Sequence, residues 1–142
     1  MKIRAVGTGT DKTATITADY VSLEGIGFSS VSLTLNLGTT GENALDTGAI
    51  GNSTWYAVWL ITSQRGEKLG CVAHAATDAA TAVTKPTLPS GYAISRFIGF
   101  VFSHTDASRL VPSTQLQDWL WVYAAPASHP PTSLMTNNMT GG

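Results

Sequence analysis

Apolar residues are densest between Trp55 and Ile61, where almost every side chain is β-branched, aromatic or aliphatic. With a period of two, this stretch has two apolar faces: Trp55, Ala57, Trp59 and Ile61 on one, and Tyr56, Val58 and Leu60 on the other. Apolar residues on both faces predict a strand that is covered on both sides. A helix is the alternative, but the run is short for a helix, and Gly51-Asn52 marks a turn just before it. We therefore expect a central strand here.

Alternation of apolar and polar residues is clearest in Val31–Leu37, which predicts a half-buried strand with its odd-numbered side chains in the core. Weaker alternation predicts two short strands at Thr13–Ala18 and Tyr20–Glu24. Ser63–Glu67 has the composition of a hairpin turn, so Lys68–Ala73 is expected to pair with the central strand.

Two further strands are expected later in the chain, at Tyr92–Ser103 and Gln115–Tyr123. In the first, the expected faces are Ile94, Ile98, Phe100 and Phe102 on one side, and Phe97 and Val101 on the other. Gly99 in the middle of this strand indicates a bulge or a close backbone approach.

Two long connections separate these strands. Gly38–Asn52 is rich in Gly and Thr, with Leu45 as a plausible anchor, and Ala75–Gly91 combines a possible helical turn with a proline-rich end. The pattern as a whole predicts an all-β fold, an antiparallel β-sandwich of the jelly-roll type with flexible or extended N- and C-terminal segments. The expected division is an N-terminal arm (1–12), the sandwich domain (13–124) and a Pro/Ser/Thr-rich tail (125–142).

The charge of the chain does not change the predicted fold, but it argues against nucleic-acid binding. Charged residues are 12% of the 142 residues and the net charge is −1, so no basic surface for nucleic acid is expected. No apolar run reaches the length of a membrane span, and Met1–Arg4 does not resemble the start of a signal peptide. Cys71 is the single cysteine; it lies among small apolar residues, and we expect it to be buried.

Candidate catalytic groups are few and scattered. The candidates are His74, His104, His129, Asp46, Asp78, Asp106 and Asp118. No Gly-x-Ser-x-Gly elbow accompanies the histidines, and His104 is expected in a solvated turn. His74 and Asp78 are the only local pair for a metal, and all the named acids except Asp118 fall in loops, where acids are ordinary turn residues. The sequence predicts no catalytic residue, no cofactor and no metal site.

Tryptophans offer a second kind of site, because exposed aromatic rings can stack on sugars or bases. The four are Trp55, Trp59, Trp119 and Trp121. Their positions on strand faces favour the alternative, an aromatic layer in the core or at a subunit contact.

Two blocks of the sequence resemble a recurring pattern in bacteriophage tail and fibre-type virion proteins. Leu45-Asp46-Thr47-Gly48 is followed by Trp55-Tyr56-Ala57-Val58-Trp59, and Pro86-Thr87-Leu88-Pro89-Ser90-Gly91-Tyr92 is followed by Arg96 and Ile98-Gly99. The resemblance covers roughly residues 31 to 123. The arm and the tail lie outside it.

The resemblance implies a β-sandwich module of a virion that is assembled in the host cytoplasm, works as a homo-oligomer, often a trimer, and contacts other virion proteins. It implies no enzyme activity. The main alternative is a receptor- or glycan-binding module at a fibre tip, with host sugars bound by the two long connections or by an exposed tryptophan. A polysaccharide depolymerase is a third and weaker hypothesis.

Overall fold

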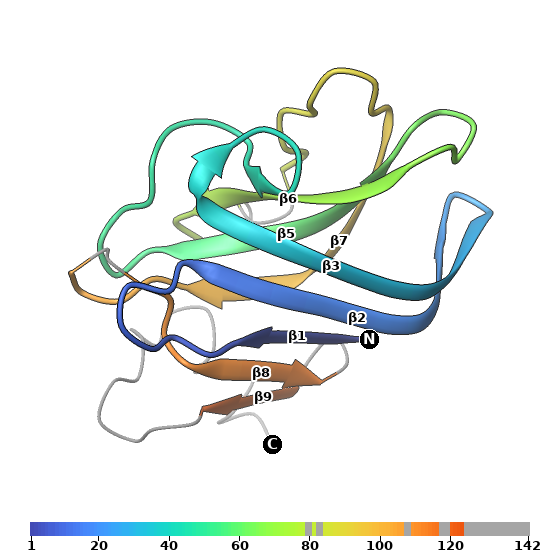
Figure 1. The fold of residues 1–142 in the computed structure, drawn as a ribbon. Coiled ribbons are helices and arrows are strands. Elements are labelled where there is room, and N and C mark those ends of the chain that lie inside the picture. The colour runs from blue at the N-terminus through green and yellow to red at the C-terminus, as the bar shows by residue number, and fades with distance from the viewer. Residues whose placement is uncertain (79–80, 82–83, 107–108, 117–119, 124–142) are drawn as a thin grey trace.

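The computed structural model describes residues 1–78, 81, 84–106, 109–116 and 120–123. Its named elements are all β-strands, and they form one nine-stranded sheet in the order β7-β5-β6-β4-β3-β2-β1-β8-β9 (Figure 1). In chain order the strands are β1 (Lys2–Ala5), β2 (Thr13–Leu23), β3 (Ile26–Thr40), β4 (Ala44–Leu45), β5 (Trp55–Thr62), β6 (Leu69–Ala76), β7 (Ile94–Phe102), β8 (Ser113–Leu116) and β9 (Leu120–Tyr123).

The all-β class is confirmed, but the antiparallel jelly-roll sandwich is not the architecture observed. The short β4 runs parallel to both β3 and β6, so the sheet is mixed. Gly41 and Asn43 adopt positive φ angles of 110° and 59°, which turn the chain after β3 and allow β4 to lie beside it. The single sheet curls until β7 passes behind β3 and β2, which makes a nearly closed barrel (Figure 1).

Side chains close the barrel where its strands do not pair. Gln115 of β8 is 2% exposed; its Nε2 donates to Ile98 O (3.0 Å) and its Oε1 accepts from Phe100 N (3.0 Å), both on β7. Arg96 of β7 donates from Nη1 to Ser22 O of β2 (3.0 Å). The Gln115 contacts satisfy backbone groups along the open edge of β7, which would otherwise need a neighbouring strand, and the Arg96 contact satisfies a carbonyl of β2.

The central strand is confirmed as β5, and all eight of its residues are buried. The predicted period of two also holds. Tyr56, Val58 and Leu60 belong to the larger core cluster, with side chains of β1, β2 and β3. The other face forms a second cluster: Trp55, Ala57, Trp59 and Ile61 with Val72, Ala76, Tyr92, Phe102 and Val111. Burial on both faces is the main stabilising contribution of this strand.

The predicted faces of β7 are wrong at one end of the strand, because a bulge changes their phase. The pairing with β5 shifts between Val58 and Trp59, opposite Gly99 and Phe97, so Ile98 is the extra residue. Ile98 and Val101 therefore face the first cluster, whereas Phe97, Phe100 and Phe102 face the second. The predicted irregularity at Gly99 is confirmed.

The two short strands expected near the N-terminus are one strand with a change of phase. Ala14 and Ile16 face the core before the change, and Val21 and Leu23 face it afterwards. The ladder with β3 omits the pair Asp19 and Ser30. Ser30 has a φ of 53°, and this local twist lets both halves of the hairpin bury their apolar side chains.

The predicted strand Val31–Leu37 lies within the longer β3, and its odd-numbered side chains are buried or pack on the first cluster. The hairpin across Ser63–Glu67 is confirmed, since β5 and β6 pair antiparallel. Leu45 is 1% exposed, as expected of an anchor.

Two predictions about the ends of the chain need correction. Residues 1–12 are not a separate arm, because β1 pairs with both β2 and β8 and buries Ile3 and Ala5. The last strand is not continuous: β8 and β9 are two antiparallel strands. Because β8 and β9 pair with each other, the chain must reverse direction between them, and Gln115–Tyr123 is not one straight strand. The predicted tail, 125–142, lies outside the described residues.

Candidate functional site

The two long connections are fastened to each other at one end of the barrel. Asp46, just after β4, accepts at Oδ2 a hydrogen bond from Thr87 N (3.1 Å). Tyr92, at the end of the second connection, donates its hydroxyl to Glu42 Oε1 in the first. Lys68 lies over the Tyr92 ring, 4.2 Å from its centroid, and contacts Ser90 O (3.5 Å). Asp46, Thr87, Ser90 and Tyr92 belong to the two resembling blocks, whereas Glu42 and Lys68 lie outside them.

Asn43 joins the first connection to β6. Its Oδ1 accepts from Cys71 N (3.0 Å), and its own N–H donates to Cys71 O (2.8 Å). Cys71 is buried as predicted, and burial together with the nearby Glu42 carboxylate raises its pKa to about 12. Burial and the hydrogen bond to Glu42 also raise the pKa of Tyr92. The Cys71 side chain is fully buried and packs in the first core cluster.

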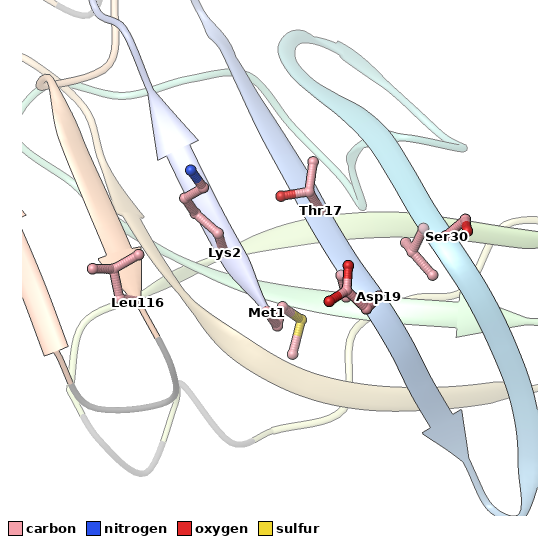
Figure 2. A pocket seen from close by; sticks show the side chains of 8 residues that line it. Met1, Lys2, Thr17, Asp19, Ser30 and Leu116 are labelled. Carbon is pink, nitrogen blue, oxygen red and sulfur yellow. The ribbon is translucent and has the colours of Figure 1, made fainter.

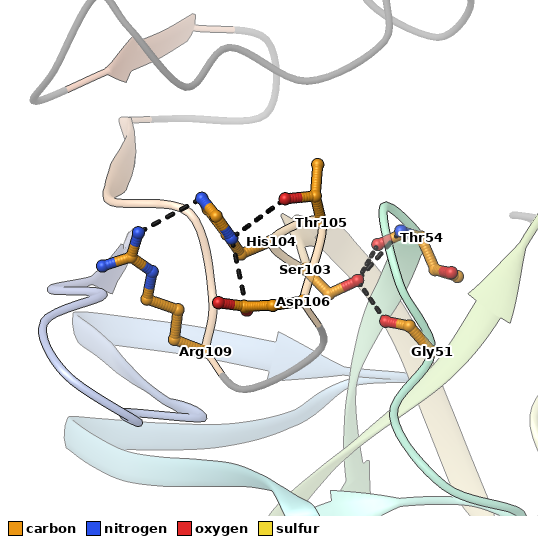
Figure 3. A network of polar contacts seen from close by, with 7 residues as sticks. All are labelled: Gly51, Thr54, Ser103, His104, Thr105, Asp106 and Arg109. Carbon is orange, nitrogen blue, oxygen red and sulfur yellow. Dashed lines mark hydrogen bonds and ion pairs between the residues drawn. The ribbon is translucent and has the colours of Figure 1, made fainter.

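His104 lies in a polar network between β7 and β8 (Figure 3). Its Nδ1 lies 3.2 Å from Asp106 Oδ1, and its Nε2 lies 3.1 Å from Arg109 Nη2. The expected turn is present. The His104 side chain is not fully solvated, however: it is 19% exposed, and Asp106 and Arg109 contact its two ring nitrogens. A guanidinium can only donate, which makes Nε2 the acceptor and places the proton of a neutral imidazole on Nδ1.

The adjacent serine does not complete a catalytic arrangement with this histidine. Ser103 is fully buried, and its hydroxyl donates to Gly51 O (2.6 Å) and accepts from Thr54 N (2.9 Å). Figure 3 shows that the two side chains point in different directions, Ser103 toward Gly51 and Thr54 and His104 toward Arg109. A nucleophile needs its base within hydrogen-bond reach. The network therefore holds the ends of the strands together and does not activate the hydroxyl.

The described tryptophans are core residues, as expected. Trp55 and Trp59 are 5% and 8% exposed. Trp55 packs edge-on against Phe102, with ring centroids 4.9 Å apart, and Trp59 packs similarly against Phe97 at 5.6 Å. Neither ring is available to stack on a sugar. The side chain of Trp121 in β9 and all of Trp119 lie outside what the structure describes.

The remaining candidates are dispersed. His74 is on β6, 9% exposed and edge-on to Trp59. Asp78 accepts from the N–H (2.7 Å) and the hydroxyl of Thr81. Within the described part of the chain, no group of three metal-ligating side chains converges. His129 and Asp118 lie outside the described residues.

A hollow that the sequence did not indicate opens on the outer face of β1, β2, β3 and β8. Its volume is about 500 Å³, and we call it the β1–β3 hollow (Figure 2). It is lined by Met1, Lys2, Thr17, Ala18, Asp19, Ser30, Val31 and Leu116. The only sequence signal for it was the lost alternation at Asp19, which we interpreted as a break between two strands.

Comparison with known proteins finds no matching family, no matching curated protein and no matching solved structure. Among the described residues, no helix is long and apolar enough to cross a membrane.

Proposed function

We propose that this chain is a non-enzymatic structural component of a bacteriophage virion, in its tail, fibre, collar or decoration layer. In this role it self-associates, with a trimer favoured, and docks to other virion proteins.

The observation that carries the proposal is how the residues of the two resembling blocks are used. Asp46 in the first connection accepts a hydrogen bond from Thr87 N in the second, and Glu42 accepts one from the Tyr92 hydroxyl. Trp55 and Trp59 fill a core layer. A repeated pattern whose polar residues fasten loops and whose aromatic residues fill a core suits a rigid assembly module.

The outer face of the hairpin β2–β3 supports self-association. Hydroxyl side chains face one another across it, with Thr15 opposite Thr34 and Thr17 opposite Ser32. Hydroxyl groups cost less to bury than charged groups, and another subunit can accept or donate hydrogen bonds to them.

Light scattering on the purified chain tests the proposal. We expect a mass three times that of the 14.9 kDa chain, and we expect the chain to copurify with particles. A monomer at every concentration that is also absent from purified particles would contradict the proposal.

A receptor- or glycan-binding module at a fibre tip is the second candidate. The β1–β3 hollow is the observation that favours it. The described tryptophans, one of the places where sugar binding was expected, are buried. In the first long connection, a smaller hollow of about 250 Å³ is lined by residues that include Gly38 and Ile50.

A further inference from the structure

We propose that the β1–β3 hollow binds an acidic saccharide, a sugar unit that carries both a carboxylate and neighbouring hydroxyl groups. The binding groups are Lys2 of β1, Thr17 and Asp19 of β2, and Ser30 of β3 (Figure 2). This inference rests on the second candidate function and gives it a location and a ligand class.

The four polar side chains of the hollow are not engaged by any other described residue. None of them makes a hydrogen bond or an ion pair with another residue in the part of the chain that the structure describes. In the two long connections, by contrast, Asp46 accepts a hydrogen bond from Thr87 N, and Glu42 accepts one from the Tyr92 hydroxyl. All four side chains are exposed, so a hydroxylated ligand in the hollow can reach them.

The backbone explains why the surface is hollowed at this point. The β2–β3 ladder pairs Ala18 with Val31 and resumes at Tyr20 with Ser29, omitting the pair between them. Ser30 holds a φ of 53°, which is uncommon for a residue with a Cβ. Such conformations are concentrated at binding sites. The hollow has a volume of about 500 Å³ and is open to solvent, so it can hold a sugar unit at the surface without enclosing it.

The combination of charges selects the ligand class. The Lys2 ammonium can only donate, so it suits a carboxylate, whereas the Asp19 carboxylate can only accept and suits a pair of sugar hydroxyls. A polyanion without donors would be repelled by Asp19. The hydroxyls of Thr17 and Ser30 serve in either role. Leu116, 38% exposed, offers an apolar surface to the C–H face of a sugar ring.

A matched pair of sugars tests the inference by NMR. ¹⁵N-labelled protein is titrated with methyl β-glucuronide and with methyl β-glucoside, which differ in the carboxylate. We expect saturable shifts at the amides of Lys2, Thr17, Asp19 and Ser30, with the glucuronide binding roughly two- to fivefold more tightly, as one exposed ion pair would give.

Single substitutions show which side chains contact the sugar. Lys2→Gln should abolish the preference for the glucuronide, and Asp19→Asn should weaken both sugars. Lys12→Gln is the matched control, because Lys12 lines a different hollow, and it should leave the preference unchanged. If the spectra of the variants match that of the unchanged protein at amides away from the hollow, the variants are folded.

Two results would overturn the inference: no saturable shift with either sugar, or binding that neither Lys2→Gln nor Asp19→Asn alters. The titration does not depend on particle assembly. A trimer by light scattering without any sugar binding would leave the virion proposal standing and remove this one.

Discussion

At the scale of single residues, the half-buried Asn43 amide and two weakly acidic groups, Cys71 and Tyr92, fasten the first long connection to the barrel. Asn43 adopts a positive φ of 59° and accepts from Cys71 N, and Glu42 accepts from the Tyr92 hydroxyl. Cys71 and Tyr92 both have raised pKa values, chiefly because burial disfavours their charged forms. Both groups therefore contribute to how stability depends on pH.

Stability should fall as the pH rises above about 9, the ordinary pKa of a thiol, toward the pKa of about 12 that Cys71 has in the folded chain. Over this range the unfolded chain loses the Cys71 proton while the folded chain keeps it, so unfolding is favoured by up to about 1.4 kcal/mol per pH unit. Below this range the contribution is fully present. Tyr92 acts in the same direction at higher pH.

Urea unfolding at about pH 7 and about pH 10.5 measures this dependence. The variant Cys71→Ala should lose less free energy of unfolding between the two pH values than the natural chain. If both proteins show the same pH slope, the assignment to Cys71 is wrong.

At the scale of elements, the fold depends on how β7 is closed against β8. The Gln115 amide satisfies Ile98 O and Phe100 N in the way that a neighbouring strand would. Its position requires a glycine opposite it, because a Cβ on Gly99 would lie 2.1 Å from Gln115 Oε1. The bulge, the glycine and the glutamine thus form one unit.

A double-mutant cycle tests this unit. Gln115→Ala leaves two buried backbone groups unsatisfied and should lower the free energy of unfolding by about 2 kcal/mol. Gly99→Ala should cost about 1 to 3 kcal/mol through the clash with the Gln115 side chain. The double variant should cost less than the two costs added together, because removing the amide also removes the clash.

Thermal and urea unfolding measure the cycle. Gln64→Ala, at an exposed glutamine in the β5–β6 turn, is the matched control and should change stability by less than about 0.5 kcal/mol. Strictly additive costs would show that Gln115 and Gly99 act independently.

The sequence predicted those elements whose pattern is local. The central strand, its two faces and its hairpin partner follow from the alternation around Trp59, and the irregularity at Gly99 follows from the glycine itself. Barrel closure was not predictable, because it depends on the amide of Gln115, 17 residues from its acceptor Ile98. The β1–β3 hollow was missed for a related reason: Lys2, Asp19 and Ser30 meet only through strand pairing.

At the scale of the whole molecule, three properties occur together. The barrel is closed by side chains, its two long connections are fastened to each other, and one outer face carries hydroxyl groups beside an open hollow. Rigidity and a weakly charged surface suit a subunit that packs into a larger assembly. Thr17 belongs both to this hydroxyl face and to the hollow, so subunit contact and sugar binding are alternative uses of the surface around Thr17.

The most direct test of the proposed function is an image of the intact particle at a resolution that traces side chains. We predict that this chain is found in the particle as symmetry-related copies, three around one axis, in contact with another virion protein. Particles whose density and peptide content lack this chain would contradict the proposal.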